Sequence, residues 1–120
     1  MKKILVIEDD KYLRDLIVEK LKKENFEILE AVDGEVGWKM TNNHHPDLVI
    51  LDIILPLLNG FDYLEMLRKK PDVAQTQVVI LSNLGQPDDI ERGKNLGVKD
   101  YLVKAHFTPK DLVEKVKQYL

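Results

Sequence analysis

The segment VILDIILPLLNG, from Val49 to Gly60, combines an apolar run with one carboxylate inside it. The run Leu48–Leu51 shows no polar alternation, which is typical of a parallel strand covered on both faces. Asp52 follows this run directly. Burial of an isolated ionised carboxylate is strongly unfavourable unless another group compensates its charge. The segment therefore predicts a buried strand that ends at a functional aspartate, whose charge must be compensated from elsewhere in the chain.

The whole chain has the length and composition of one globular domain. It contains 120 residues, of which 44% are hydrophobic and 32% are charged. The net charge of -3 argues against a grip on a nucleic-acid backbone, which needs a basic face. Cysteine is absent, so disulfides and thiolate metal sites are excluded. No apolar run reaches the roughly 20 residues of a membrane span or the length of a secretory signal. We therefore expect a soluble, cytoplasmic protein.

Short apolar runs recur along the chain and predict strands. Four of them lack polar alternation and are expected to be buried strands: Ile4–Ile7, Leu48–Leu51, Val78–Leu81 and Tyr101–Val103. A fifth run, Phe26–Val32, contains Glu27 and Glu30 and is expected to be a partly solvated edge strand.

Amphipathic helical patterns separate these strands. In the first, expected over about residues 10 to 24, one face carries Leu13, Leu16, Ile17 and Leu21. Four more helices are expected after Asp33, from Phe61 to before Pro71, up to Gly97, and from an N-cap at Thr108. Strands that alternate with helices over short connections predict an α/β fold, a doubly wound five-stranded parallel sheet with five helices on its two faces. No linker divides the chain, so residues 1–120 are expected to form one domain.

Polar side chains follow the predicted strands at corresponding positions. Glu8 and Asp9 follow the first strand, Asp52 the third, Ser82 the fourth and Lys104 the fifth. Ligand sites of open α/β sheets lie at the carboxyl ends of the strands. If the first and third strands are neighbours, three carboxylates share one crevice and need a cation. Oxygen ligands without His or Cys favour a hard ion such as Mg²⁺.

A carboxylate in such a site can accept a phosphoryl group as an aspartyl phosphate. A metal ion, the Lys104 ammonium and the Ser82 hydroxyl would then offset charge on the phosphoryl oxygens. Taken singly, each residue has an ordinary explanation: a solvated surface lysine for Lys104, a turn residue for Ser82, and a helix N-cap for Asp10. The coincidence of polar groups at four matching strand ends favours the functional interpretation.

The same residues resemble the receiver domain of two-component response regulators over essentially the whole chain. The resemblance rests on ILVIEDD (Ile4–Asp10), PDLVILDIILPLLNGFDYL (Pro46–Leu64), Ser82 and LGVKDYLVKA (Leu96–Ala105). It implies a flavodoxin-like fold with strand order 2-1-3-4-5. It also implies a phosphorylation-activated signalling switch that catalyses only its own phosphorylation and dephosphorylation and is not otherwise an enzyme.

The resemblance assigns roles in phosphoryl transfer to individual residues. Asp52 resembles the phosphoacceptor, which takes a phosphoryl group from a phosphohistidine of a sensor histidine kinase or phosphotransfer protein. Asp9 resembles the direct Mg²⁺ ligand, with Glu8 acting largely through water and the backbone carbonyl of Ile54 as a further ligand. Mg²⁺ is therefore the implied cofactor.

Other residues resemble the switch that reports phosphorylation. Ser82 and Lys104 would contact the phosphoryl oxygens, and Tyr101 resembles the aromatic residue whose ring turns inward when Ser82 moves. The face built from the fourth helix, fifth strand and fifth helix, about Pro87 to Leu120, would carry homodimerisation or docking of a target. No direct nucleic-acid binding is expected of this domain, and no membrane contact.

The chain departs from the family pattern near the site. Lys104 is followed by Ala105, where a proline in a cis peptide is usual, so this bond is either strained or trans. Asn83 stands where a smaller residue is common. Ile54 and Leu84 flank the pocket with apolar side chains that cannot orient an attacking water, which predicts slow self-dephosphorylation.

Two alternatives remain open at this point. A phosphatase of the haloacid dehalogenase type also uses an aspartate nucleophile, but on its first strand, whereas Asp52 follows the third. A pseudo-receiver would be a binding module that is never phosphorylated, although its usual mark, loss of an acidic residue or of the lysine, is absent here. The sequence alone leaves the cognate kinase, the output target and the oligomeric state undetermined, and fits either a stand-alone receiver or part of a longer regulator.

Overall fold

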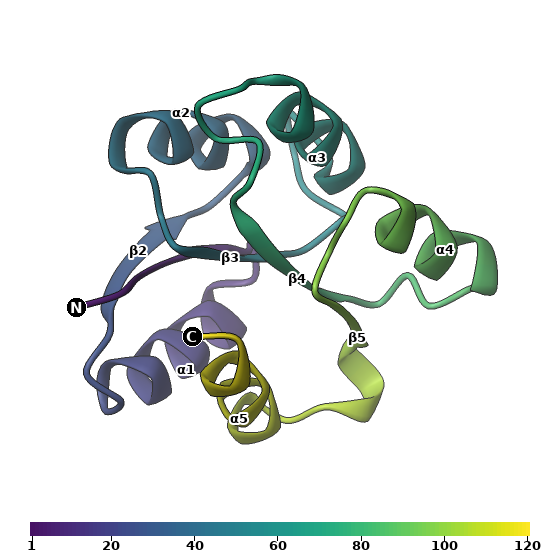
Figure 1. Ribbon diagram of the computed structural model, residues 1–120. Coiled ribbons are helices and arrows are strands. Elements are labelled where there is room, and N and C mark those ends of the chain that lie inside the picture. Colours follow the sequence, from purple (N-terminus) through teal and green to yellow (C-terminus); the bar gives the residue numbers. More distant parts are fainter.

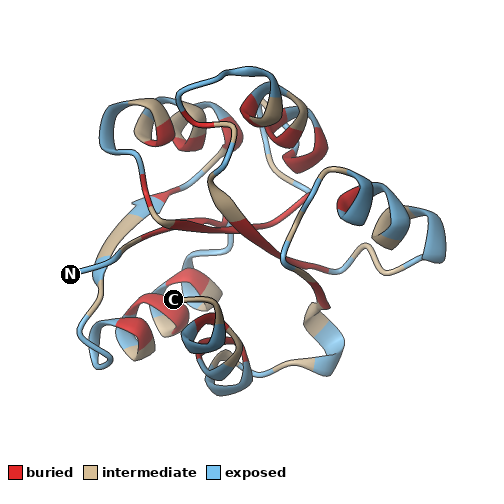
Figure 2. Ribbon diagram, in the orientation of Figure 1, coloured by how far each residue is buried: buried red, intermediate tan, exposed pale blue.

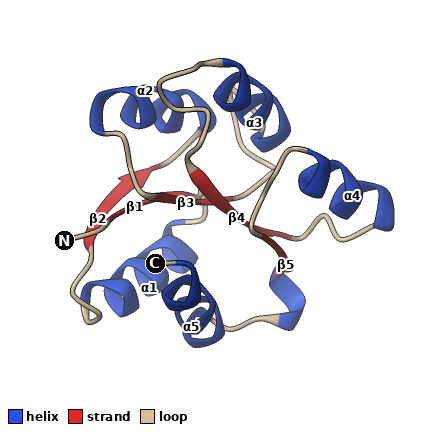
Figure 3. Ribbon diagram, viewed as in Figure 1, coloured by secondary structure: helices blue, strands red, loops and turns tan.

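The computed structural model describes all 120 residues as five strands and five α-helices that alternate along the chain (Figures 1 and 3). The strands are β1 (Lys3–Ile7), β2 (Glu27–Ala31), β3 (Leu48–Leu51), β4 (Gln77–Ser82) and β5 (Asp100–Val103). The helices are α1 (Lys11–Lys22), α2 (Gly34–His44), α3 (Gly60–Lys69), α4 (Pro87–Asn95) and α5 (Pro109–Tyr119), with a 3₁₀ turn η1 (Lys104–His106) after β5. All strand pairs are parallel, in the order β2-β1-β3-β4-β5. The expected fold class and strand order are confirmed.

Helices cover both faces of the sheet. Helices α2, α3 and α4 lie on one face, and α1 and α5 lie on the other (Figure 1). Successive side chains of a strand point to opposite faces. Leu5 and Ile7 of β1 therefore pack into the core beneath α2 and α3, whereas Ile4 and Val6 pack into the core against α1 and α5. This double coverage buries every residue of β3 and all but the first residue of β1 and β4, and it explains why their apolar runs show no polar alternation (Figure 2).

The outer strands differ from the central ones. β2 is an edge strand, as its two glutamates predict, and only Ala31 within it is buried. β5 forms the opposite edge, and only its central residues Tyr101 and Leu102 are buried. The apolar run Tyr101–Val103 therefore predicts burial less well than the runs in β1 and β3. The reason is that β5, as an edge strand, has a neighbouring strand on one side only.

Side-chain caps determine where several helices begin. The Asp10 carboxylate accepts a hydrogen bond from Leu13 N–H, so this residue is the N-cap of α1. Thr108 caps α5 in a reciprocal capping box with Asp111. The fourth helix is shorter than expected and ends at Asn95, with Gly97 beyond it in the left-handed region at φ +76°.

The loop from β3 to α3 packs too closely for a side chain at Gly60. A Cβ placed there would lie 2.5 Å from the backbone oxygen of Asp52. Gly60 N–H also donates a hydrogen bond to Ile53 O at 2.8 Å. The glycine therefore allows the start of α3 to pack closely against the strand end that carries Asp52. None of the helices has the length and hydrophobicity needed to cross a membrane.

Candidate phosphoacceptor and metal site

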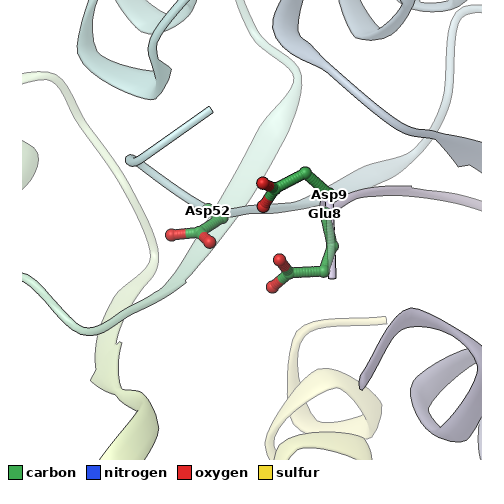
Figure 4. A group of neighbouring side chains, drawn as sticks. All are labelled: Glu8, Asp9 and Asp52. Carbon is green, nitrogen blue, oxygen red and sulfur yellow. The ribbon is translucent and has the colours of Figure 1, made fainter. Parts of the chain in front are cut away.

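Three carboxylates meet at the carboxyl ends of β1 and β3. These strands are neighbours, with Ile7 opposite Leu51, so the residues that follow them lie side by side. One carboxylate oxygen each from Glu8, Asp9 and Asp52 lies within 4.8 Å of the others, and Figure 4 shows the side chains of Glu8 and Asp9 directed toward Asp52. Glu8 and Asp52 are buried and Asp9 is exposed. The structure thus brings the three acidic residues into one crevice that opens to solvent at Asp9.

The Asp52 carboxylate is compensated by defined partners. Its Oδ1 accepts hydrogen bonds from Ile53 N–H at 2.7 Å and from Ile54 N–H at 3.4 Å. Its Oδ2 accepts a hydrogen bond from the Lys104 ammonium at 2.8 Å. Charged hydrogen bonds of this kind offset the loss of hydration on burial. The charge of Asp52 at the end of a fully buried strand is therefore compensated by two backbone N–H groups of the following loop and by Lys104, which is distant in the sequence.

Lys104 bridges two of the three carboxylates. Its Nζ lies 2.8 Å from Asp52 Oδ2 and 2.9 Å from Glu8 Oε1. Burial lowers the pKa of Lys104, but its hydrogen bonds to Asp52 and Glu8 outweigh that effect and raise the pKa above its usual value. The Lys104–Ala105 peptide bond is trans. The sequence left open whether this bond is strained or trans, and the structure has the trans form. With a trans bond the Lys104 ammonium still contacts Asp52 and Glu8.

Glu8 is the carboxylate most affected by its surroundings. Its pKa is raised to about 7 by burial, while the hydrogen bond from Lys104 opposes the rise and the charge of Asp52 adds to it. Its Oε2 also accepts a hydrogen bond from Asp10 N–H at 3.1 Å. Near neutral pH this carboxyl group therefore exchanges a proton readily, and any cation that binds beside it competes with that proton.

The pocket at this strand edge has a volume of about 280 Å³. Its lining comprises the acidic residues of the first turn, Asp52 and Lys104, with Ile54 and Asn83 at the side. Ile54 lines the pocket and is 57% exposed to solvent. The donors are oxygen atoms alone, a set that fits a hydrated hard divalent cation and excludes ions that require His or Cys ligands.

Ser82 and Tyr101 lie beside the site and share Leu84 as a partner. The Ser82 hydroxyl is fully buried and accepts a hydrogen bond from Leu84 N–H at 3.2 Å. The Tyr101 hydroxyl donates to Leu84 O at 2.6 Å. Burial raises the pKa of Tyr101 to about 12, with added effects from Asp89 and Asp52, so the phenol stays a donor. Ser82 is fully buried and is not among the residues that line the acidic pocket.

Sequence reasoning missed one further residue near the site, Arg14. The buried face of α1 is formed by Arg14, Ile17, Val18 and Leu21, whereas the expected Leu13 and Leu16 are only half-buried. Arg14 precedes Ile17 and Val18 by three and four positions, which places it in the apolar stripe. This position could have identified Arg14 from the sequence, because a charged residue in a buried stripe requires polar partners. Its guanidinium donates to the backbone oxygen of Glu8 at 2.7 Å.

Comparison with known proteins agrees with the geometry. Residues 4–117 match the family model of the response regulator receiver domain. The chain is 35% identical over 119 residues to the probable transcriptional regulator ycf27 of Cyanophora paradoxa, an alignment that covers 99% of this chain and 48% of that protein. The receiver domain of the Francisella response regulator 1452 has a TM-score of 0.90 at 30% identity and covers 98% of this chain and 95% of its own. The Mn(2+)-bound form of response regulator Rcp1 has a TM-score of 0.84 at 29% identity, with coverage of 98% and 91%.

The doubly wound sheet and the acidic site at its carboxyl edge thus define a class that controls signalling through phosphorylation of an aspartate. The chain belongs to the response regulator receiver domain family of two-component signal transduction. It spans about half the length of the curated relatives that it matches.

Proposed function

We propose that Asp52 accepts a phosphoryl group from the phosphohistidine of a sensor histidine kinase or phosphotransfer protein. A carboxylate oxygen of Asp52 attacks phosphorus, the phosphorus–nitrogen bond breaks, and the imidazole leaves with the electrons of that bond. The observation that carries the proposal is the convergence of Glu8, Asp9 and Asp52 with Lys104 at one strand edge. Few structural roles require three acids and a lysine in one open pocket.

The acidic pocket would hold Mg²⁺ as the cofactor of this reaction. Asp9 would ligate the ion directly, Glu8 largely through water, and Asp52 and the backbone carbonyl of Ile54 would complete the protein ligands. When bound, Mg²⁺ supplies positive charge that offsets the charge on the phosphoryl oxygens. The proposal is supported by the oxygen-only donor set and by the Mn(2+)-bound state of the related Rcp1.

Lys104 and Ser82 would contact the phosphoryl oxygens after transfer. Lys104 already binds Asp52, and an added phosphoryl group would offer its ammonium a more highly charged partner. The Ser82 hydroxyl, which accepts a hydrogen bond from Leu84 N–H, would turn and donate a hydrogen bond to a phosphoryl oxygen. Tyr101 would follow, because its hydroxyl binds the carbonyl of that same Leu84. Phosphorylation would thereby change the surface formed by α4, β5 and α5.

That surface would pass the signal on through a homodimer or an output target. In support, Gly93 is the only buried residue of α4, so most of this helix is free to contact a partner. The first turn of α4 carries Asp88 and Asp89, whereas α5 carries the exposed Lys110 in its first turn. A symmetric pair that sets α4 of one copy against α5 of the other would match these opposite charges.

We further propose that residues 1–120 act as one receiver domain that catalyses only its own phosphorylation and dephosphorylation. Direct binding to nucleic acid is not expected of this domain, because its net charge is -3. A cytoplasmic location would place it alongside the kinases that phosphorylate such domains.

Incubation with acetyl phosphate and Mg²⁺, followed by intact-mass analysis, tests the proposal. We expect one phosphoryl adduct that is absent in Asp52→Asn and retained in Asp15→Asn, a matched control at an exposed aspartate of α1. Removal of Mg²⁺ with a chelator should abolish the adduct. A wild-type protein without an adduct would be a pseudo-receiver. Repeated turnover of a phosphate monoester would point to a phosphatase.

A further inference from the structure

We propose that Arg14 is a positioning residue for the metal site, which it serves by anchoring the backbone of the turn that presents Glu8 and Asp9. The proposal rests on the Mg²⁺-dependent function above and adds a residue to it. Arg14 reaches no phosphoryl group or metal ligand oxygen, so its role would be exerted through the peptide that joins the two acids.

Arg14 makes one buried and one partly buried hydrogen bond. Its Nη1 donates to the backbone oxygen of Glu8 at 2.7 Å, and its Nε donates to Glu30 Oε1 at 3.3 Å. Its side chain is only 10% exposed. An arginine remains charged at all ordinary pH values, and its planar fork holds two acceptors in a fixed geometry. The guanidinium therefore links the end of β1 to β2 from a position on α1.

The Glu8 carbonyl needs this donor because it lies beyond the sheet. The last backbone bond between β1 and β3 runs from Asp52 N–H to Ile7 O at 3.1 Å, and Glu8 N–H donates to Ala31 O of β2 at 3.1 Å. The next carbonyl, that of Glu8, receives its hydrogen bond from Arg14 instead of from a strand. A buried carbonyl without a donor is costly. Arg14 thus provides a hydrogen bond to the first peptide beyond β1, the one that joins Glu8 and Asp9.

The position of that peptide matters for the metal site. Asp9 follows it directly. The Lys104 ammonium holds Glu8 and Asp52 together but forms no ion pair with Asp9. Without Arg14, the Glu8–Asp9 peptide would lose the hydrogen bond to its carbonyl, and Asp9 would shift relative to the other two acids. Residues that orient metal ligands in this indirect way typically change metal affinity by about 10- to 100-fold when they are replaced.

The test is the dissociation constant of Mg²⁺, measured by titration of amide NMR signals at a temperature where every variant is folded. We expect Arg14→Met to weaken Mg²⁺ binding by about tenfold or more, and to shift the Asp9 and Asp10 amide signals before any metal is added. Arg14→Lys should recover part of the affinity, because a lysine can donate to the Glu8 carbonyl but cannot hold Glu30 in the same fork. Glu30→Ala should produce a smaller loss.

Arg68→Met is the matched control. Arg68 donates to the backbone oxygens of Ala74, Thr76, Leu96 and Gly97, in loops that precede β4 and β5 at the opposite edge of the sheet. Its loss should lower stability and leave Mg²⁺ affinity unchanged. Equal Mg²⁺ losses in the Arg14 and Arg68 variants, or wild-type affinity in Arg14→Met, would overturn the positioning role while the proposed function stood. A wild-type protein that binds no Mg²⁺ would overturn both.

Discussion

The ammonium of Lys104 lies 2.8 Å from Oδ2 of Asp52, although 52 residues separate the two in the chain. The contact joins the strand ends of β3 and β5, which are not adjacent in the sheet. It places a positive charge against the carboxylate that is proposed to accept phosphorus. In the absence of a metal ion, this lysine is the main positive charge that holds Asp52 and Glu8 together.

Replacement of Lys104 by Met should destabilise the metal-free protein. The change leaves two buried carboxylates without their shared cation. We expect the free energy of unfolding to fall by about 3 kcal/mol, the lower end of the range for breaking a buried ion pair, because the lysine side chain is 18% exposed. Added Mg²⁺ should restore more stability to this variant than to the wild type. Urea unfolding with and without Mg²⁺ measures both effects.

Lys99→Met provides the control for that comparison. Lys99 is exposed and its side chain makes no ion pair with the acidic pocket. Surface changes of this kind usually alter stability by no more than about 0.5 kcal/mol. Equal destabilisation of the two variants would contradict the role given to the Lys104 bridge.

Mg²⁺ affinity should depend on pH through Glu8. Its pKa of about 7 means that the group is largely protonated below neutrality, and the metal must then displace the proton. We expect the affinity to fall as the pH is lowered from 8 to 6, by up to about tenfold per unit below the pKa. Glu8→Gln should bind Mg²⁺ more weakly at pH 8 and with little change over this interval. Calorimetric titration at several pH values provides the measurement.

The same pKa predicts the sign of a stability change in the metal-free protein. Glu8 titrates near 4.5 in the unfolded chain and near 7 in the folded one, so the folded state binds the extra proton between these values. The contribution of Glu8 to stability is therefore full below pH 4.5 and is lost as the pH rises through 7. The difference in unfolding free energy between wild type and Glu8→Gln should change in this direction over that interval. A difference that does not vary with pH would contradict the raised pKa.

Self-dephosphorylation should be slow because an apolar side chain stands at the pocket. Ile54 lines the opening and offers no group that can orient an attacking water. We expect the aspartyl phosphate to last for minutes or longer. Ile54→Asn should shorten its lifetime about five- to tenfold, the equivalent of one added hydrogen bond of about 1 kcal/mol in the transition state. Ile54→Leu is the control, and a wild-type half-life of seconds would refute the expectation.

Gly93→Ala should disturb the contact between α4 and Tyr101. A Cβ at Gly93 would lie 2.7 Å from Tyr101 Cδ2 and 3.1 Å from Ile80 Cδ1, so the ring or the helix must move. Overpacking of this kind costs about 1–3 kcal/mol of stability. The hydrogen bond from the Tyr101 hydroxyl to Leu84 should weaken, which NMR of the tyrosine ring would report. Lys94→Ala, at the next and exposed position of α4, should leave both stability and ring signals unchanged.

Much of the fold could be predicted from local sequence. The strands β1, β3 and β4 each contain an unbroken apolar run because helices cover both of their faces. The caps at Asp10 and Thr108 mark helix starts through short-range hydrogen bonds. The first helix shows where local pattern is insufficient. Its buried stripe includes Arg14 in place of Leu13, because the guanidinium of Arg14 finds partners in Glu8 and Glu30, which lie outside the helix.

Local sequence patterns are enough to predict which residue types come at the end of each strand, and therefore that acids, a hydroxyl and a lysine reach the same end of a parallel sheet. Which of these groups touch depends on the packing of the whole chain. It set Lys104 between Glu8 and Asp52, turned the Ser82 hydroxyl toward Leu84, and raised the pKa of Glu8 to about 7. The physical reason is that strand position follows from the periodicity of neighbouring residues, whereas contacts and burial depend on strand order and on side chains that are distant in the chain.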